Sequence, residues 1–253
     1  MGAGVDWAVG GLLTARVLPT LLYKGAGLVK GVGFNSWRGV GGAAQAMKVY
    51  FMREVDQMVL LDLTPGPPDL ELIAGLARDC AFLPFAVGGG VSTLGHVDGL
   101  LNAGADMVVV NTAAMDRPAF VSEVADRFGS QAIVVSIDVR ETVWVESGTR
   151  DTGLDPVEAA KRAEGDGAGE ILITSIERDG TMKGYDCDLI RAVSNAVDTP
   201  VTASGGAGCY EHFAEALDAG ASAVAAASMF HFTEQTPREA KCFLRDRGFE
   251  VRL

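Results

Sequence analysis

Short apolar runs alternate with longer amphipathic stretches along nearly the whole chain. The short runs are typical of buried strands, and the amphipathic stretches are typical of helices that cover a sheet. A helix is predicted after each strand, for example from Pro156 to Glu164 with Asp155 as N-cap, and from Pro237 to Arg247 with Gly248 after its end. The eight predicted strands are Val17–Leu22, Met58–Leu61, Leu83–Val87, Met107–Val110, Ala132–Ile137, Ile171–Thr174, Val201–Ala203 and Ala223–Ala226.

Repeated strand–helix units predict a closed (βα)8 barrel, an α/β fold of the TIM-barrel type whose chemistry sits at the carboxyl ends of its strands. An open, doubly wound sheet is the alternative. The chain also resembles itself at an offset of 116 positions, since Pro84–Gly90 is echoed by Pro200–Gly206. Two matched half-barrels close more naturally into a ring than into an open sheet. The same offset places Leu22 where the second half carries Asp138.

Composition supports a buried sheet and excludes some partners. A hydrophobic fraction of 48% and 32 glycines suit a parallel sheet covered on both faces and joined by tight turns. The net charge of -12 disfavours nucleic acid and anionic membranes as partners. No apolar run approaches the roughly 18 residues of a membrane span. We therefore expect neither a nucleic-acid nor a membrane partner.

The cysteines and the domain boundaries complete this outline. Cys80, Cys187, Cys209 and Cys242 form no C-x-x-C pair, so neither a zinc site nor a disulfide framework is indicated, and a cytoplasmic protein is expected. No metal and no cofactor are predicted. Residues 1–15 are interpreted as an N-terminal extension without the basic start of a secretory signal, and residues 16–253 as a single barrel domain.

Small residues and hydroxyl groups follow four of the predicted strands at matched places in the two halves. Gly88–Gly90 and Asn111–Thr112 form one cluster, and Gly205–Gly206 and Ala227–Ser228 form its counterpart. Main-chain N–H groups at such turns can hold a phosphate without a lysine. A single Gly pair is equally well explained as a tight turn. Four coincident elements predict an elongated bisphosphate ligand.

Asp138 ends the fifth predicted strand and is the first candidate for general acid/base catalysis, with a capping or loop-bonding aspartate as the alternative. Lys30 lies in a glycine-rich segment, Gly25 to Gly42, that predicts a lid carrying a mobile cation or else a flexible surface loop. Further candidates for contacts with substrate hydroxyl groups, all near strand ends, are Thr174, Asp179 and Ser204.

The remaining aromatic and histidine residues carry less information. His96, His212 and His231 fall on predicted helices or on the last strand-to-helix connection, and we interpret them as structural. Trp144 lies in a polar segment, Glu141 to Asp151, which predicts a small hairpin near the barrel mouth.

Several longer motifs resemble the family of the cyclase subunit of imidazole glycerol phosphate synthase over about residues 16 to 252. These motifs are Val87–Gly90, Asn111–Ala114, Phe128–Gln131, Gly167–Ile171, Thr174–Thr181, Gly184–Asp186, Ala203–Gly208 and Phe230–Phe232. The resemblance implies a barrel that receives ammonia from a docked glutaminase and combines it with a bisphosphate at its mouth. The implied products are imidazole glycerol phosphate and an aminoimidazole carboxamide ribotide.

Carried over residue by residue, the resemblance makes Asp138 one catalytic aspartate, Lys30 the lid lysine, and Asp62 and Thr174 polar residues of the mouth. The implied phosphate contacts are Gly90, Asn111, Thr112, Asp179, Gly180, Gly206, Ala227 and Ser228. The chain departs from the family at Leu22, where the other catalytic aspartate is expected. Because leucine neither gives nor takes a proton, cyclisation is expected to be lost or changed.

The resemblance also implies a charged gate at the bottom of the barrel and a glutaminase docked there. The matching gate residues are Arg16, Gln57, Met107 and Glu170, of which two are ionic, and Asp106 lies beside them on the partner face. Nothing in the chain resembles a glutaminase, because no cysteine lies on a nucleophile elbow. A separate glutaminase is therefore the expected partner, with ordinary packing of the neutral gate residues as the alternative.

Other stretches are similar to paralogues associated with acetamidino-sugar formation, which also tend to lack the first aspartate and pair with a glutaminase and a separate amidotransferase. These stretches are Leu28–Gly31, Arg53–Asp56, Thr152–Pro156 and Asp179–Asp186. The resemblance thus favours amidination of a phosphorylated or nucleotide-linked sugar. The alternatives are the histidine-pathway cyclase, which Ala227–Phe232 and Gly248–Arg252 resemble, a scaffold that only conducts ammonia, and a solitary sugar-phosphate isomerase.

Overall fold

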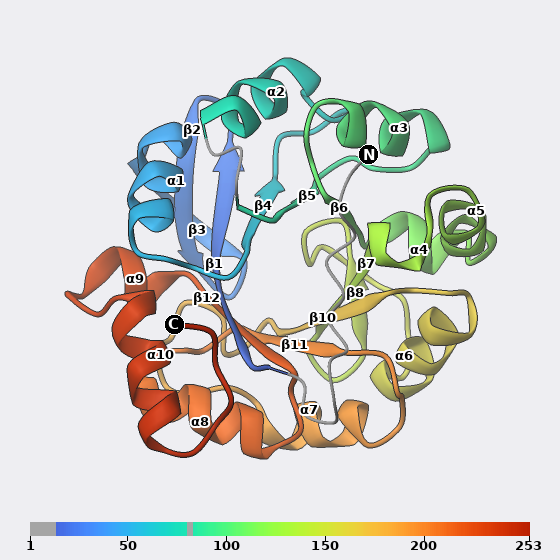
Figure 1. Ribbon diagram of the computed structural model, residues 1–253. Coiled ribbons are helices and arrows are strands. Elements are labelled where there is room, and N and C mark those ends of the chain that lie inside the picture. Colours follow the sequence, from blue (N-terminus) through green and yellow to red (C-terminus); the bar gives the residue numbers. More distant parts are fainter. Residues whose placement is uncertain (1–13, 80–82) are drawn as a thin grey trace.

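The computed structural model describes residues 14–79 and 83–253. Eight parallel strands close into a barrel, because β7 pairs with both β6 and β10 and so joins the two ends of the strand order. The predicted (βα)8 barrel is confirmed (Figure 1). The barrel strands are β1 (Arg16–Lys24), β4 (Met58–Asp62), β5 (Phe85–Gly88), β6 (Met107–Val110), β7 (Ile133–Val139), β10 (Glu170–Ser175), β11 (Val201–Ser204) and β12 (Ala223–Ala226).

Helices surround the barrel and cover the outer face of its strands (Figure 1). They are α1 (Ala43–Met52), α2 (Leu70–Asp79), α3 (Leu94–Asn102), α4 (Thr112–Asp116), α5 (Ala119–Phe128), α6 (Pro156–Gly165), α7 (Cys187–Ser194), α8 (Tyr210–Asp218), α9 (Ser228–Phe232) and α10 (Pro237–Asp246), with a 3-10 turn at Ser130–Ala132. Asp155 caps α6 by accepting from two main-chain N–H groups, as predicted. Thr236 opens α10 with a capping box.

Two predicted strands begin earlier than the structure has them. The third barrel strand begins at Phe85 and not at Leu83, after Pro84, which has no N–H group for a ladder bond. The fifth begins at Ile133, because Ala132 closes the 3-10 turn by donating to Gly129 O. The other predicted strands agree with the structure to within two residues at either end.

The segment predicted to be a lid or a flexible surface loop is an ordered hairpin, so the prediction of an unstructured loop is wrong. Residues 25–42 contain an antiparallel hairpin of β2 (Gly27–Val32) and β3 (Asn35–Gly41), and β2 extends the sheet by pairing with β1. The glycines of this hairpin let its two strands approach each other closely and let the chain turn between them. A Cβ on Gly31 would lie 2.1 Å from Asn35 O, and Gly33 turns at a φ of +58°. Glycine content here reflects a tight hairpin and not an unstructured loop.

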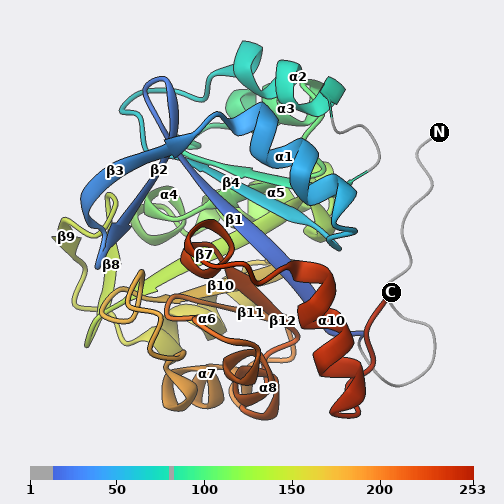
Figure 2. The ribbon, with the colours of Figure 1, turned by 90° about the vertical axis from the view of Figure 1, so that its left-hand side faces the viewer.

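A second hairpin stands where the polar segment around Trp144 predicted one. Its strands are β8 (Val143–Val145) and β9 (Arg150–Asp151), and β8 pairs with β7 so that Trp144 lies opposite Asp138. Figure 2 shows both hairpins at the same end of the barrel, on the left of the view, and the C-terminus at the other end. The hairpins therefore surround the mouth at the carboxyl ends of the strands.

Apolar residues form two separate layers. A large cluster fills the space between the strands and the helices. A smaller one, which includes Leu18, Val59, Ala86 and Leu172, fills the inside of the barrel. Every barrel strand except β11 contributes one or two residues to the inner cluster, which fits the alternation of side chains along strands.

Some predictions fall outside the described residues. The first thirteen residues of the interpreted extension and Cys80 are among them, whereas Ala15 pairs with Val251 beside the barrel. Cys187, Cys209 and Cys242 are free thiols. Within residues 14–79 and 83–253, no helix has the length and apolar character that crossing a membrane requires.

Candidate active site

A cavity of about 790 Å³ opens at the carboxyl ends of the strands. This volume is in the range of sites for small molecules. Every residue predicted for catalysis or for ligand contact lines it. They are Leu22, Lys30, Asp62, Gly90, Asn111, Thr112, Asp138, Thr174, Asp179, Gly180, Ser204, Gly206, Ala227 and Ser228. The structure thus brings together residues that lie more than two hundred positions apart, and it joins both glycine clusters to Asp138.

One residue from each barrel strand lines the cavity near the mouth, and the strand registers divide these residues into two rows. In the first half-barrel, Leu22 pairs with Leu61, Leu61 with Gly88, and Gly88 with Val109. We call these four residues the apolar row. In the second half, the polar row runs through Asp138, Thr174, Ser204 and Ala225 in the same way. The two half-barrels therefore present opposite chemistry to one cavity.

Asp138 is a buried carboxyl group held by neighbours on both sides. Its Oδ1 accepts from Ser136 Oγ at 3.2 Å, and its Oδ2 accepts from Asn111 Nδ2 at 3.3 Å. Burial raises the pKa of Asp138 to about 7, because the hydrogen bond from Ser136 offsets only part of the cost of removing the charge from water. A carboxyl group that titrates near neutral pH can both give and take a proton, as general acid/base catalysis requires.

Thr20 occupies the place in β1 that Ser136 occupies in β7, two residues before the mouth position. Its side chain is 7% exposed and lines the cavity. Among the described residues, its hydroxyl group has no hydrogen-bond partner. In the second half, the Ser136 hydroxyl group donates to Asp138, two residues further along the strand. The residue two positions after Thr20 is Leu22, whose side chain has no oxygen that could accept. Both hydroxyl groups were missed from sequence, although each stands on the same strand face as a predicted mouth residue.

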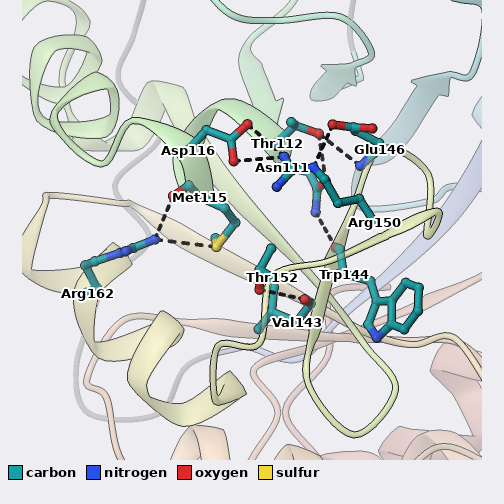
Figure 3. Close-up of polar contacts among 10 residues, drawn as sticks. All are labelled: Asn111, Thr112, Met115, Asp116, Val143, Trp144, Glu146, Arg150, Thr152 and Arg162. Carbon is teal, nitrogen blue, oxygen red and sulfur yellow. Dashed lines mark hydrogen bonds and ion pairs between the residues drawn. The ribbon is translucent and has the colours of Figure 1, made fainter.

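Asn111 and Thr112 are bonded to the β8–β9 hairpin, as Figure 3 shows. The Asn111 amide donates to Ser136 O at 3.1 Å as well as to Asp138, and it approaches Trp144 O at 3.5 Å. Thr112 Oγ1 accepts from the main-chain N–H of Glu146 at 3.1 Å. Both residues therefore attach the β8–β9 hairpin to the cluster, and Asn111 also orients the carboxylate of Asp138.

An ion-pair group closes the same hairpin onto α4 (Figure 3). Arg150 donates to both carboxylate oxygens of Asp116 at 2.8 Å, and its Nε donates to Glu146 Oε1 at 2.7 Å. Sequence analysis missed this group, because Asp116 lies 34 positions from Arg150 and meets it only through the fold. Their side chains are 40% to 52% exposed, so solvent weakens the attraction and the group mainly fixes the position of the hairpin.

The two glycine clusters have main chain so closely packed that side chains are excluded. A Cβ on Gly90 would lie 1.9 Å from Gly66 O, and one on Gly206 would lie 2.1 Å from Gly184 O. Both residues also have positive φ, at +63° and +114°. Both glycines line the cavity, so the main chain of these loops borders it without intervening side chains.

Lys30, predicted as a mobile cation, lies in β2 and lines the cavity. Its side chain is 2% exposed in this structure. Burial lowers the pKa of Lys30 to about 8, and the nearby carboxylate of Asp179 works against this shift. Burial lowers the pKa of His231 to about 4 as well, with Lys30 adding to the effect, so His231 is neutral beside the lysine.

The hairpin is attached to the loop that carries Asp179. Gly33 N donates to Asp179 O at 3.0 Å, and a Cβ on Gly180 would lie 2.2 Å from Gly31 O. Burial raises the pKa of Asp179, and Lys30 opposes the rise. Within the described part of the chain, Oδ2 of this carboxylate is buried without a hydrogen-bond partner. Asp179 and Lys30 thus line the same cavity as opposite charges that influence each other's pKa.

The predicted gate residues meet at the opposite end of the barrel. Arg16 Nη1 donates to Gln57 Oε1 at 2.8 Å and to Glu170 Oε2 at 3.1 Å, and Gln57 Nε2 lies 3.9 Å from Met107 Sδ. We call these four residues the bottom ring. Glu170 also accepts from the hydroxyl group of Thr202. The ring contains one ion pair, in agreement with the two ionic residues counted in the sequence.

The remaining predicted residues have structural contacts. Asp106 accepts from Phe85 N at 2.9 Å and so fixes the start of β5 near the bottom ring. His96 and His212 each accept a main-chain N–H group at Nδ1, from Ser92 and from Gly208. In residues 14–79 and 83–253, no cluster of histidine, cysteine and acidic side chains has the composition of a metal site.

Comparison with known proteins places this barrel in a family. A family described as "Histidine biosynthesis protein" matches residues 16–236. A protein of Thermobifida fusca (strain YX), named imidazole glycerol phosphate synthase subunit HisF, is 45% identical over 254 residues, which cover 95% of this chain and 99% of the relative. A protein of the same name from Salinispora arenicola (strain CNS-205) is 46% identical over 253 residues, with the same coverage.

The chain therefore belongs to the histidine biosynthesis protein family, and within it to the HisF family. This agrees with the resemblance seen in the sequence motifs. Both relatives bear the name of the histidine-pathway subunit, which was the alternative interpretation. Neither name refers to sugar amidination, so the assignment to the acetamidino-sugar branch finds no support in these comparisons.

Proposed function

We propose that this chain is the ammonia-using barrel subunit of an enzyme of the imidazole glycerol phosphate synthase type. The observation that carries the proposal is the single cavity that joins Asp138 to both glycine clusters. In the proposed reaction, ammonia and a bisphosphate meet at the mouth and yield imidazole glycerol phosphate and an aminoimidazole carboxamide ribotide. Membership of the HisF family supports this class of reaction.

The two glycine clusters bind the two phosphate groups in this proposal. In this proposal the main-chain N–H groups of Gly90 and Gly206 donate to the phosphates, and the hydroxyl groups of Thr112 and Ser228, which line the same cavity, add to them. Lys30, which also lines the cavity, supplies a buried positive charge. Because main-chain donors are fixed by the fold, they bind a dianion without the entropy cost of ordering long side chains.

Asp138 is the proposed general acid/base. Its pKa of about 7 lets it exchange a proton near neutral pH, and Asn111 and Ser136 hold its two oxygens in place. Leu22 cannot contribute a second exchange. Proton transfer at that side of the ligand therefore falls to solvent or to the ligand itself, and slow turnover is expected.

Ammonia is proposed to arrive through the barrel from a separate glutaminase docked around the bottom ring and Asp106. The ring lies on the barrel axis at the amino ends of the strands, opposite to the mouth. With one ion pair in place of a fully charged ring, docking is expected to depend weakly on ionic strength.

In a second candidate function, ammonia reaches the mouth by the same route but reacts with a different acceptor. Leu22 favours it, because the position next to the ligand has lost the carboxylate that family resemblance implies. In this candidate the barrel delivers ammonia for amidination of a phosphorylated or nucleotide-linked sugar, together with a separate amidotransferase. A scaffold that conducts ammonia without chemistry is the limiting form of the same idea.

Ammonium-dependent conversion of the bisphosphate substrate tests the proposal. Purified protein with saturating ammonium should form imidazole glycerol phosphate slowly, and Asp138→Asn should lower the rate by about 10²-fold or more. Product formation that Asp138→Asn leaves unchanged would contradict the assigned role. If no product forms while a glutaminase still binds and is activated, the second candidate is favoured.

A further inference from the structure

A buried ion pair joins the last helix to the bottom of the barrel. Lys241 belongs to α10, which lies beside the first part of β1 (Figure 2). Its Nζ donates to Asp56 Oδ1 at 3.2 Å and to the main-chain oxygen of Glu54 at 2.6 Å. The side chains of Lys241 and Asp56 are 3% and 7% exposed. One ammonium group therefore holds two points of the loop between α1 and β4.

Asp56 extends this contact to β1. Its other oxygen, Oδ2, accepts from Val17 N at 2.9 Å. Main-chain pairing of β1 with β4 begins three residues further along each strand, so the carboxylate continues the contact of the two strands toward the bottom of the barrel. Arg16 precedes Val17, and Gln57 follows Asp56. These two neighbours meet in the bottom ring, where Arg16 Nη1 donates to Gln57 Oε1 at 2.8 Å.

The strand contact alone does not explain the buried pair. Asp106 accepts from Phe85 N at the start of β5 in the same way, and Asp106 is exposed. This kind of bond therefore does not require a buried carboxylate. Burying two opposite charges costs about as much as their attraction returns, and apolar residues of the same size are often as stable. The pair does supply a fixed position, because its hydrogen bonds have narrow limits of length and direction.

The turn before Asp56 is held by the same lysine. Glu54 has a φ of +54°, a left-handed conformation that is uncommon for residues other than glycine. Lys241 binds its carbonyl oxygen and so holds the turn. Arg238, also in α10, lies 3.5 Å from the Glu54 carboxylate, with side chains 67% and 56% exposed. Helix α10 thus makes one buried and one exposed contact with the same loop, and the exposed contact provides a matched control.

We propose that Lys241 and Asp56 are positioning residues of the bottom ring, at the entrance of the barrel. They set the spacing at which Arg16 and Gln57 meet. The placement follows from the contacts above, and its use rests on the proposed function, in which ammonia enters the barrel through this ring. Lys241 acts through the loop, and Asp56 acts through the start of β1. Without the pair, the two strand starts lose the link that fixes their spacing, and the entrance transfers ammonia less efficiently while the mouth is unchanged.

NMR signals of the Gln57 side-chain amide test the placement. Gln57 is 1% exposed, so its amide exchanges slowly with water as long as the ring is in place. Lys241→Met keeps most of the length of the side chain and removes the ammonium group. It should shift the Gln57 amide signals of the folded protein and speed their exchange about tenfold or more. Arg238→Met removes the exposed contact of the same helix and should change neither quantity.

A double variant separates position from stability. Lys241→Met alone leaves a buried carboxylate without its cation and should lower the urea midpoint of unfolding. Adding Asp56→Asn removes that charge, and the new amide oxygen can still accept from Val17 N, so the midpoint should recover. The Gln57 signals should stay shifted, because α10 no longer holds the loop. Signals that return to their wild-type positions together with the midpoint would overturn the inference, since the pair would then only stabilise the fold.

Product formed per glutamine hydrolysed is the functional measurement, with the glutaminase subunit of Thermobifida fusca, the source of the 45% identical relative, as the added partner. Lys241→Met should lower this yield several-fold and leave ammonium-dependent turnover unchanged, because ammonium reaches the mouth from solvent. Equal losses with both nitrogen sources, or unchanged Gln57 signals, would overturn the inference. If wild-type protein forms no product from either source, or none from glutamine, the proposed function or its docking is contradicted, and the Gln57 signals alone decide the placement.

Discussion

Ser136 donates its hydroxyl group to Asp138 across 3.2 Å, two residues further along the same strand. The matching hydroxyl group of the other half-barrel, that of Thr20, is buried and has no partner in the part of the chain that the structure describes. The pair of a strand hydroxyl group and an acceptor two residues later is therefore present in the second half-barrel, whereas the first half-barrel has the hydroxyl group without the acceptor. This asymmetry determines what the mouth can do, and it leads to measurable differences in stability and activity.

Thr20→Val should stabilise the protein. The substitution keeps the shape of the side chain and removes a buried hydroxyl group without a hydrogen bond, which costs about 1 to 3 kcal/mol where it stands. We expect the free energy of unfolding in urea to rise by roughly 1 kcal/mol. Ser136→Ala is the matched control, because its hydroxyl group is bonded and its loss should destabilise. A Thr20→Val protein that is less stable than wild type would show that the hydroxyl group has a partner in solution.

The stability of the fold should depend on pH through Asp138. Burial raises its pKa to about 7 in the folded state, whereas an exposed aspartate titrates near pH 4. Between these values the folded protein keeps a proton that the unfolded chain releases. The stabilising contribution is therefore complete below about pH 4 and is lost as the pH rises to about 7.

Asp138→Asn isolates this contribution. Relative to the variant, the wild-type free energy of unfolding should fall by roughly 2 to 4 kcal/mol between pH 4 and pH 7.5. Urea unfolding of both proteins at a series of pH values measures the difference. A difference that is constant across this range would mean that Asp138 titrates normally and is open to solvent.

Leu22→Asp should raise ammonium-dependent turnover if proton exchange limits the reaction. The new carboxylate would stand opposite Asp138, with the Thr20 hydroxyl group placed to donate to it as Ser136 donates to Asp138. A positioned acid/base group typically contributes about 10² to 10⁴-fold. Leu22→Asn is the control, since it has a similar shape and polarity and exchanges no proton at neutral pH. Equal rates for the two variants would exclude a role for the carboxylate.

Removing the Arg16–Glu170 ion pair of the bottom ring should lower the stability of the protein, and a second substitution should restore it. The side chains of Arg16 and Glu170 are 14% and 10% exposed, so Arg16→Met leaves a poorly solvated carboxylate near the barrel axis. We expect a loss of roughly 3 kcal/mol in the free energy of unfolding. The double variant Arg16→Met/Glu170→Gln should recover most of it. If the double variant is no more stable than the single one, the ion pair is not what holds the ring together.

The sequence identified the barrel, because each buried strand is a short apolar run and the half-to-half repeat is visible in the printed chain. It also identified Asp138 and Leu22 as matched positions, since a constant offset requires no knowledge of the fold. The hairpin around Lys30 was not predicted, because its many glycines suggested a locally flexible loop. Its structure is instead decided by the pairing of β2 with β1 and by the contact with the Asp179 loop, neither of which is visible in the local sequence.

The apolar row could not be predicted from sequence alone. Leu61 and Val109 are ordinary residues of apolar strands, and their sequence neighbours are just as hydrophobic. Which of them faces the cavity depends on the register of three strand pairs, and a shift of one residue would reverse it. The hydrogen bonds from Asn111 to Asp138 and Ser136 depend on the fold in the same way, because they join residues 27 and 25 positions apart.

The register of the two rows also means that the halves of this barrel are no longer interchangeable. A protein assembled from two copies of the second half would carry two facing carboxylates at its mouth. One assembled from two copies of the first half would have a mouth without any ionisable group at this level, although its strands and helices would follow the same plan. The two duplicated halves have become specialised parts, one for chemistry and one for shape.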